Sequence, residues 1–203
     1  MMATFIPHDR HRMMAELLDV SHLTPELKAY LNKVGLNGYP ADIEAKCSVI
    51  TVALVKFFAD VGDGTEIFRF NMSGAPAVVV GVHGASGEWP IDLVAWPLQS
   101  SGVERVATYR QEADVLGVPE LLAKRPAGVP LQLHRHPHDW VNARFQGAMI
   151  LNQQWGGHWL SKAQGPFLCT DVEHGRAVAE MLRPFGKAYL VVLPASLALK
   201  EAA

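Results

Sequence analysis

The strongest constraint on the fold of this chain is the alternation of element types over its last third. Short apolar runs alternate there with helix-like segments, at residues 131–134, 137–145, 148–151, 167–170, 172–182 and 188–193. Such alternation is typical of strands that pair in parallel, because each helix carries the chain back across the sheet. We therefore expect a βαβ-like sheet that is covered by helices.

The middle of the chain has a different sequence pattern. Three short β-rich runs, residues 67–71, 77–83 and 91–96, are separated by turns rich in Gly, Ser and Pro. This spacing predicts an antiparallel meander. Together with the last third it predicts an α+β fold with a mixed sheet over residues 65–203. A chain of 203 residues is long enough for one core and short for two, so we expect a single domain.

Residues 1–61 are expected to form a helical portion that packs on this sheet. Thr24 can cap a second helix, Pro25 suits its first position and Gly35 ends it. Apolar side chains then recur every three or four positions over residues 43–61, which is a helical period. The β-branched run at residues 49–52 favours a strand instead. A periodic segment of about twenty residues is too long for an ordinary strand, however, and we predict a helix.

The charge and composition limit the classes of partner. The chain has 18 Lys plus Arg against 20 Asp plus Glu, and therefore no excess of positive charge. Because non-specific binding to nucleic acids needs such an excess to neutralise phosphates, we expect none here. No apolar run is long enough to span a bilayer, and the N-terminus does not look like a secretory signal. Cys47 and Cys169 lie among apolar residues, which is typical of buried free thiols. We expect a cytoplasmic protein that does not bind membranes.

The densest group of chemically useful side chains is His134, Arg135, His136, His138 and Asp139. They lie at the end of a predicted strand and the start of a predicted helix, at the edge of a parallel sheet where ligands usually bind. The order of these residues resembles the His-x-His-x-Asp-His motif of metallo-β-lactamase-like hydrolases. The final Asp-His pair of that motif is inverted here, to His138-Asp139. We consider the three histidines and Asp139 as ligands of a divalent metal such as zinc or manganese. A solvated junction without a metal is the alternative.

A second junction between strand and helix could complete that site. Asp171 could join the metal ligands, while Glu173 or His174 could act as general base on a bound water. The same residues have a structural explanation. Thr170 and Glu173 have the spacing of a capping box ahead of an apolar helix.

Two further features each have a functional and a structural interpretation. Trp155 and Trp159 flank Gly156 and Gly157, which suggests either aromatic side chains on a hinged loop that contacts a partner, or core packing beside a turn. Asp92 is similar to the metal-binding aspartate of restriction-type nucleases. No Glu-x-Lys or Gln-x-Lys follows it in a β context, so the nuclease prediction fails at its second required element.

A large part of the chain resembles a group of α/β proteins of unknown activity that are encoded in proteobacteria, often among prophage-like genes. The resemblance covers roughly residues 75–185, and its motifs are IDLVAW, ADVLG, PLQLH, GAMIL and DVEHGR at residues 91–96, 113–117, 130–134, 147–151 and 171–176. It implies a bacterial or phage origin and a role connected with phage DNA metabolism.

These observations leave two hypotheses for the function. The first is a non-catalytic binding or accessory protein, with an unknown protein partner or a second copy of the chain. The second is a metal-dependent hydrolase or nuclease that uses the 134–139 cluster. An enzyme needs the polar groups of the two junctions to converge in one concave site.

Overall fold

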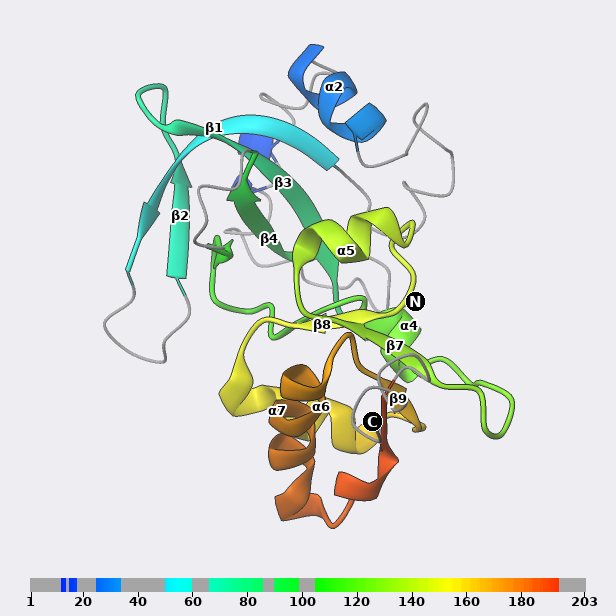
Figure 1. Ribbon diagram of the computed structural model, residues 1–203. Coiled ribbons are helices and arrows are strands. Elements are labelled where there is room, and N and C mark those ends of the chain that lie inside the picture. The colour runs from blue at the N-terminus through cyan, green and yellow to red at the C-terminus, as the bar shows by residue number, and fades with distance from the viewer. Residues whose placement is uncertain are drawn as a thin grey trace, which may run out of the picture. The chain divides into compact units, whose positions relative to one another are not determined.

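The structure of the chain is a computed structural model that describes residues 12–13, 15–17, 25–33, 50–59, 66–85, 90–98 and 105–193 (Figure 1). The chain divides into two compact units. The barrel unit comprises Met1–Val82 and Trp89–Ala113, and the sheet unit comprises His83–Glu88 and Asp114–Ala203. The fold is α+β with mixed sheets, as predicted. Strands before and after the expected boundary at residues 61–65 close one barrel, so this boundary does not coincide with the one between the two units.

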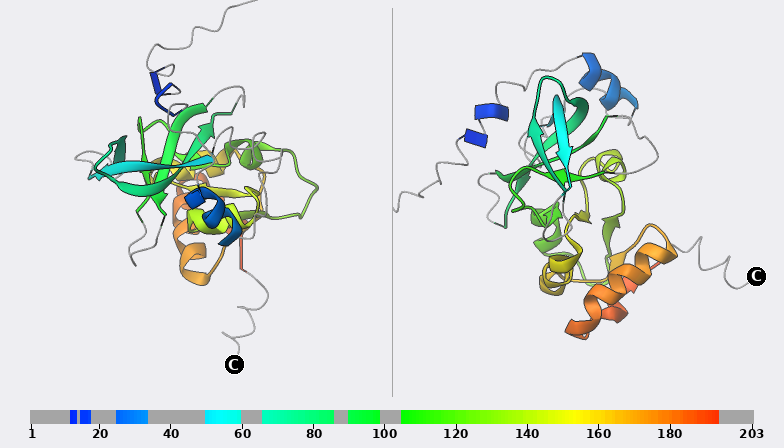
Figure 2. Two further views of the ribbon diagram at one scale, coloured as in Figure 1. Left: turned by 90° about the horizontal axis from the view of Figure 1, so that it is seen from above. Right: turned by 90° about the vertical axis from the view of Figure 1, so that its left-hand side faces the viewer.

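The strands of the barrel unit close in the order β1-β2-β5-β4-β3. Their bounds are Ile50–Phe58 for β1, Glu66–Phe70 for β2, Ala75–His83 for β3, Pro90–Pro97 for β4 and Ala107–Thr108 for β5. Strand β1 is antiparallel to both β2 and β3, while β2 and β5 run parallel. The meander expected from the sequence is therefore a barrel, since β3 pairs with β1 and not with β2. In the turned views of Figure 2 its cyan and green strands curve around a common interior.

Strand β1 corrects the prediction of a helix over residues 43–61, of which residues 43–49 and 60–61 lie outside the described part. Burial along β1 alternates: Ala53 and Val55 are buried, whereas Leu54 and Lys56 are exposed. That is the period of a strand with one face in the core. The β-branched run decided the conformation, because β1 has a partner strand on each side.

Small side chains fill much of the barrel interior. The core includes four alanines together with Phe68 and several aliphatic residues, namely Ala53, Ala77, Ala95, Ala107, Val55, Val79 and Leu93. Met13 and Leu17, from the first helical turns, are also fully buried in this core. These two side chains therefore contribute to the core of the barrel.

Helix α2 (Pro25–Lys33) begins at Pro25, as predicted. It contacts β1, and its Tyr30 and Leu31 are buried. Among the described residues, no helix is both long and apolar enough to cross a membrane.

The sheet unit contains five strands in the order β10-β9-β7-β8-β6. Strands β10, β9, β7 and β8 run parallel, and β6 is antiparallel to β8 at one edge. The elements in chain order are β6 (Val115–Leu116), α4 (Val118–Leu122), β7 (Leu131–His134), α5 (Pro137–Asn142), β8 (Ala148–Ile150), α6 (Gln153–Lys162), β9 (Phe167–Leu168), α7 (Val172–Leu182), the 3-10 helices η1 (Arg183–Phe185) and η2 (Ala188–Leu190), and β10 (Val191–Val192). The expected βαβ-like part is confirmed.

Helices cover both faces of this sheet. Helix α5 lies over β7 and β8 on one face, while α6 and α7 pack against each other on the opposite face (Figures 1 and 2). The chain passes from β7 to β8 on one side and later returns to β9 on the other side of β7. The strand order therefore reverses at β7. Ligands in α/β sheets bind outside the carboxyl ends of the strands at such a point.

Candidate functional site

A cavity of about 270 Å³ lies at the carboxyl ends of β7 and β8, beside helix α7. We call it the histidine cleft. Its polar lining residues are His134, Arg135, Gln153, Glu173 and His174, and its apolar ones are Ile150, Ala177 and Met181. The two junctions predicted from the sequence thus do meet in one hollow, through His134 and Arg135 on one side and Glu173 and His174 on the other.

His134 is the last residue of β7, and its side chain is buried. Its Nε2 lies 2.9 Å from the carbonyl oxygen of Gln146. A carbonyl only accepts, so Nε2 carries the proton and Nδ1 keeps the lone pair. Burial lowers the pKa of His134, against the opposing effects of this hydrogen bond and of the charge of Asp139. The ring is therefore a neutral imidazole with a defined tautomer.

The turn that presents the Gln146 carbonyl depends on Gly147. Gly147 has φ +83°, and a Cβ there would lie 2.4 Å from the carbonyl oxygen of Gln132. Only glycine combines this conformation with so close an approach to β7. His134 and Gly147 together fix the start of β8 beside β7.

His174 lies in the first turn of α7. Its Nδ1 accepts a hydrogen bond from the backbone N–H of Thr170, at 3.4 Å. In the neutral ring the proton is then on Nε2, which is a donor. Burial lowers the pKa of His174; Asp171 opposes that effect, and Arg135 adds to it. At neutral pH this imidazole is also uncharged, with the tautomer opposite to that of His134.

An ion-pair group joins the end of β7 to the start of α7. Arg135 Nη1 lies 2.8 Å from Glu173 Oε2 and 3.3 Å from Asp171 Oδ2. The other oxygen of Asp171, Oδ1, accepts from the backbone N–H of His174 at 2.7 Å and caps α7. This backbone hydrogen bond, followed by Arg135, lowers the pKa of Asp171. The cap is thus Asp171, not the Thr170 of the predicted capping box.

The residues predicted to hold a metal do not form a ligand set. His134 donates from Nε2, Asp171 caps a helix and pairs with Arg135, and His136 is the N-cap residue of α5. His138 and Asp139 lie within α5. In the part of the chain that the structure describes, no three His, Cys, Asp or Glu side chains are placed to hold a metal ion. The donor set therefore does not fit a structural or catalytic zinc or manganese site.

Zinc added to protein purified without nickel is expected to leave the melting temperature unchanged. The carboxylates would have to leave Arg135 to bind it, and His134 would have to leave Gln146. The measurement is a thermal melt with and without zinc or manganese, beside metal analysis of the purified chain. Stoichiometric metal that disappears in a His136→Ala, His138→Ala double variant would contradict this expectation.

Trp155 and Trp159 lie on helix α6 and not on a hinged loop. Gly156 and Gly157 are buried where α6 meets α7. A Cβ on Gly157 would lie 2.3 Å from the carbonyl oxygen of Met181. The two glycines therefore allow close helix packing. Trp159 donates to Asp114 Oδ2 at 3.0 Å, whereas Trp155 is 52% exposed.

Asp92 is a buried structural carboxylate of the barrel unit. It accepts backbone hydrogen bonds from Leu93, Arg110, Glu112 and Ala113, at 2.7, 2.8, 2.9 and 3.2 Å. The carboxylate therefore ties the chain after β5 to strand β4. This structural role of Asp92 agrees with the absence of a Glu-x-Lys or Gln-x-Lys sequence after it, which a restriction-type nuclease would need.

Sequence reasoning missed Gln153, Ile150, Ala177 and Met181 in the cleft, because their side chains look like ordinary helix or strand residues until α6 and α7 meet. The sequence indicates Arg135 only as part of the histidine cluster, and its pairing with two carboxylates at the start of α7 depends on the parallel order of β7 and β9. Comparison of the chain with protein-family models, curated proteins and solved structures gives no match. The relation to proteobacterial and prophage proteins stays a prediction.

Proposed function

We propose that the protein is a non-catalytic binding protein whose sheet unit takes a small, uncharged polar ligand in the histidine cleft. The observation that carries this proposal is the presence of two neutral imidazoles of opposite tautomer in one cavity, at the point where the strand order reverses. A volume of about 270 Å³ is just below the range for drug-sized ligands, and suits a single heterocyclic ring with its substituents.

The hydrogen-bonding groups of the cleft are complementary to a neutral amide-like edge. His134 offers an acceptor at Nδ1, His174 offers a donor at Nε2, and the amide of Gln153 offers both. Ile150, Ala177 and Met181 supply apolar contact for the body of the ligand. A nucleobase or another cyclic amide has this combination of edge and body.

The charge of the cleft disfavours an anion. With both imidazoles neutral, Arg135 carries one positive charge against the two negative charges of Asp171 and Glu173. A carboxylate or phosphate entering the cleft would meet this excess of negative charge.

The same contacts argue for binding and against catalysis. Glu173, predicted as a general base, is 79% exposed and paired with Arg135, and the Nδ1 lone pair of His174 accepts from Thr170. Burial raises the pKa of Cys169 to about 12, so this thiol remains protonated. These residues therefore provide neither an activated nucleophile nor an unpaired carboxylate.

Titration with uracil and 2-pyridone tests the proposal, with the Met181 methyl signal in NMR as the readout. Both compounds are expected to shift this signal in a saturable way. His174→Phe keeps an aromatic ring and removes the donor, so the dissociation constant should rise about tenfold, the worth of one hydrogen bond. Binding should also weaken as the pH falls, because a protonated His134 loses its acceptor.

The matched control is His158→Phe, an exposed histidine of α6 outside the cleft. It should leave the dissociation constant unchanged. Benzoate and inorganic phosphate should not shift Met181. Tighter binding of either anion, or no saturable shift with the neutral rings, would overturn the proposal.

A further inference from the structure

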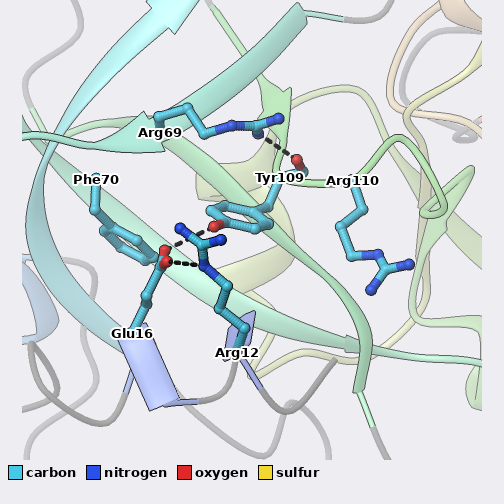
Figure 3. A pocket seen from close by; sticks show the side chains of 6 residues that line it. All are labelled: Arg12, Glu16, Arg69, Phe70, Tyr109 and Arg110. Carbon is cyan, nitrogen blue, oxygen red and sulfur yellow. Dashed lines mark hydrogen bonds and ion pairs between the residues drawn. The ribbon is translucent and has the colours of Figure 1, made fainter. Parts of the chain in front are cut away.

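The barrel unit contains a second cavity, of about 500 Å³. Its lining residues are Arg12, Glu16, Arg69, Phe70, Tyr109 and Arg110, and we call it the arginine pocket (Figure 3). It combines three arginines with the rings of Phe70 and Tyr109. The residues come from the N-terminal helical turns, from β2 and from the segment after β5.

The three arginines differ in how their charges are balanced. Arg12 pairs with Glu16 at 3.1 Å, and Arg110 pairs with Glu112 at 2.7 Å. Arg69 instead donates from Nη1 to the carbonyl oxygens of Phe68 and Tyr109, which are neutral acceptors. The structure shows no ion pair between Arg69 and any described carboxylate. One positive charge of the pocket is therefore uncompensated, and it is that of Arg69.

The aromatic part of the pocket is held rigidly. The rings of Phe70 and Tyr109 have centroids 5.9 Å apart and are tilted by 37°, and both pack against the buried ring of Phe68 at 5.6 Å. The guanidinium carbon of Arg69 lies 4.8 Å from the centroid of the Tyr109 ring, and Figure 3 shows this side chain beside the ring. A planar group bound at Phe70 or Tyr109 would therefore lie next to a cation.

Glu16 keeps this arrangement in place. Tyr109 donates from its hydroxyl to Glu16 Oε2 at 2.6 Å, and Glu16 also holds Arg12. Burial, followed by the hydrogen bond to Glu16, raises the pKa of Tyr109 to about 12. The phenol is therefore neutral, and among the described residues that line the pocket only Glu16, which is paired with Arg12, carries a negative charge.

We propose that the arginine pocket binds a nucleoside phosphate, with the phosphate at Arg69 and the base against the rings of Phe70 and Tyr109. Arginine recognises phosphate through paired N–H donors, and aromatic rings stack on any base. A cavity of about 500 Å³ has the size of ordinary small-molecule sites and is large for a benzoate-sized anion. The ligand is either a free mononucleotide or the end of a single strand. This site is independent of the function proposed for the histidine cleft.

Calorimetric titration of the full chain with AMP, adenosine and inorganic phosphate tests the proposal. AMP is expected to bind more tightly than either of its parts. Arg69→Gln should weaken AMP binding at least about tenfold, since it removes a charge-assisted contact. Arg69→Lys keeps the charge but not the paired donors. Its affinity for AMP should lie between those of the wild type and Arg69→Gln.

Arg105→Gln is the matched control. Arg105 belongs to the same barrel, pairs with Glu66 at 2.8 Å and lies over the ring of Phe57, but it does not line the pocket. It should leave AMP binding unchanged. A short oligothymidylate distinguishes a single strand from a free mononucleotide as the natural ligand. If it binds more tightly than AMP, the ligand is a single strand, and if it binds no more tightly, the ligand is a mononucleotide. Adenosine binding as tightly as AMP, equal losses in Arg69→Gln and Arg105→Gln, or no binding of AMP would each overturn the proposal.

Discussion

Asp92→Ala is expected to lower the free energy of unfolding by about 3 kcal/mol or more. The substitution removes the acceptor of four backbone N–H groups, and those of Leu93 and Ala113 are buried. An unsatisfied buried donor costs about 1–3 kcal/mol. Denaturant unfolding followed by circular dichroism measures the loss. Amide exchange should show faster exchange at Leu93, Arg110, Glu112 and Ala113.

Two comparisons make this result specific. Asp92→Asn keeps one acceptor oxygen and should cost less than the alanine variant. Glu66→Gln removes a half-exposed carboxylate of the same barrel and should change stability by less than about 1 kcal/mol. If Asp92→Ala were no more destabilising than Glu66→Gln, the four hydrogen bonds would not be holding the barrel.

The same carboxylate has a predictable effect on the pH dependence of stability. Burial raises the pKa of Asp92 from 3.8 to about 6, against the opposing effect of the four N–H donors. The folded state then binds the proton more tightly than the unfolded chain. The stability contributed by protonated Asp92 is therefore fully present below about pH 4 and is lost as the pH rises through about 6. The stability difference between wild type and Asp92→Ala should widen by about 3 kcal/mol between neutral pH and about pH 4.

Gly157→Ala is expected to destabilise the sheet unit by about 2–4 kcal/mol, although alanine favours helices over glycine by about 1 kcal/mol. The added Cβ would lie 2.3 Å from the backbone oxygen of Met181, which cannot move without moving α7. Denaturant unfolding followed by tryptophan fluorescence gives the change, and the Met181 methyl signal should shift as well.

The sign of this effect decides between two roles for the glycine pair. A hinge between two tryptophans would be stabilised by alanine, through the smaller entropy of the unfolded chain. His158→Ala, at an exposed position of the same helix, is the control and should be nearly neutral. A stabilised Gly157→Ala variant would mean that α6 and α7 are not in close contact at this position.

Local signals predicted β7 and α7 well, whereas the segment of helix α6 was expected to be a loop or a turn. Strand β7 occupies residues 131–134 and helix α7 residues 172–182, with the bounds expected from the sequence. Their apolar positions and their flanking polar residues agree on one conformation. The barrel was not predictable in this way. In β1 the apolar residues fit both a helical and a strand period, and pairing with β2 and β3 decided between them.

In the candidate sites too, the sequence indicated individual residues but not the contacts that depend on the fold. The sequence pointed to His134 and His174, since both lie at or just beyond the ends of strands of the predicted parallel sheet. It could not show that Arg135 pairs with Asp171 and Glu173, and this pairing is what disqualifies the carboxylates as metal ligands. The arginine pocket had no sequence signature at all. Its residues come from three segments that only barrel closure brings together.

The reactivity of Cys169 can be used to measure local opening of the sheet unit. The thiol is fully buried in the core between β9 and α7, and its raised pKa keeps it protonated. A thiol reagent can modify it only when that core opens, so the rate of its alkylation follows the population of the open state. Site-resolved mass spectrometry of the labelled chain would thus follow the opening of the core behind the histidine cleft, and a ligand that binds the closed form of the cleft should slow the reaction.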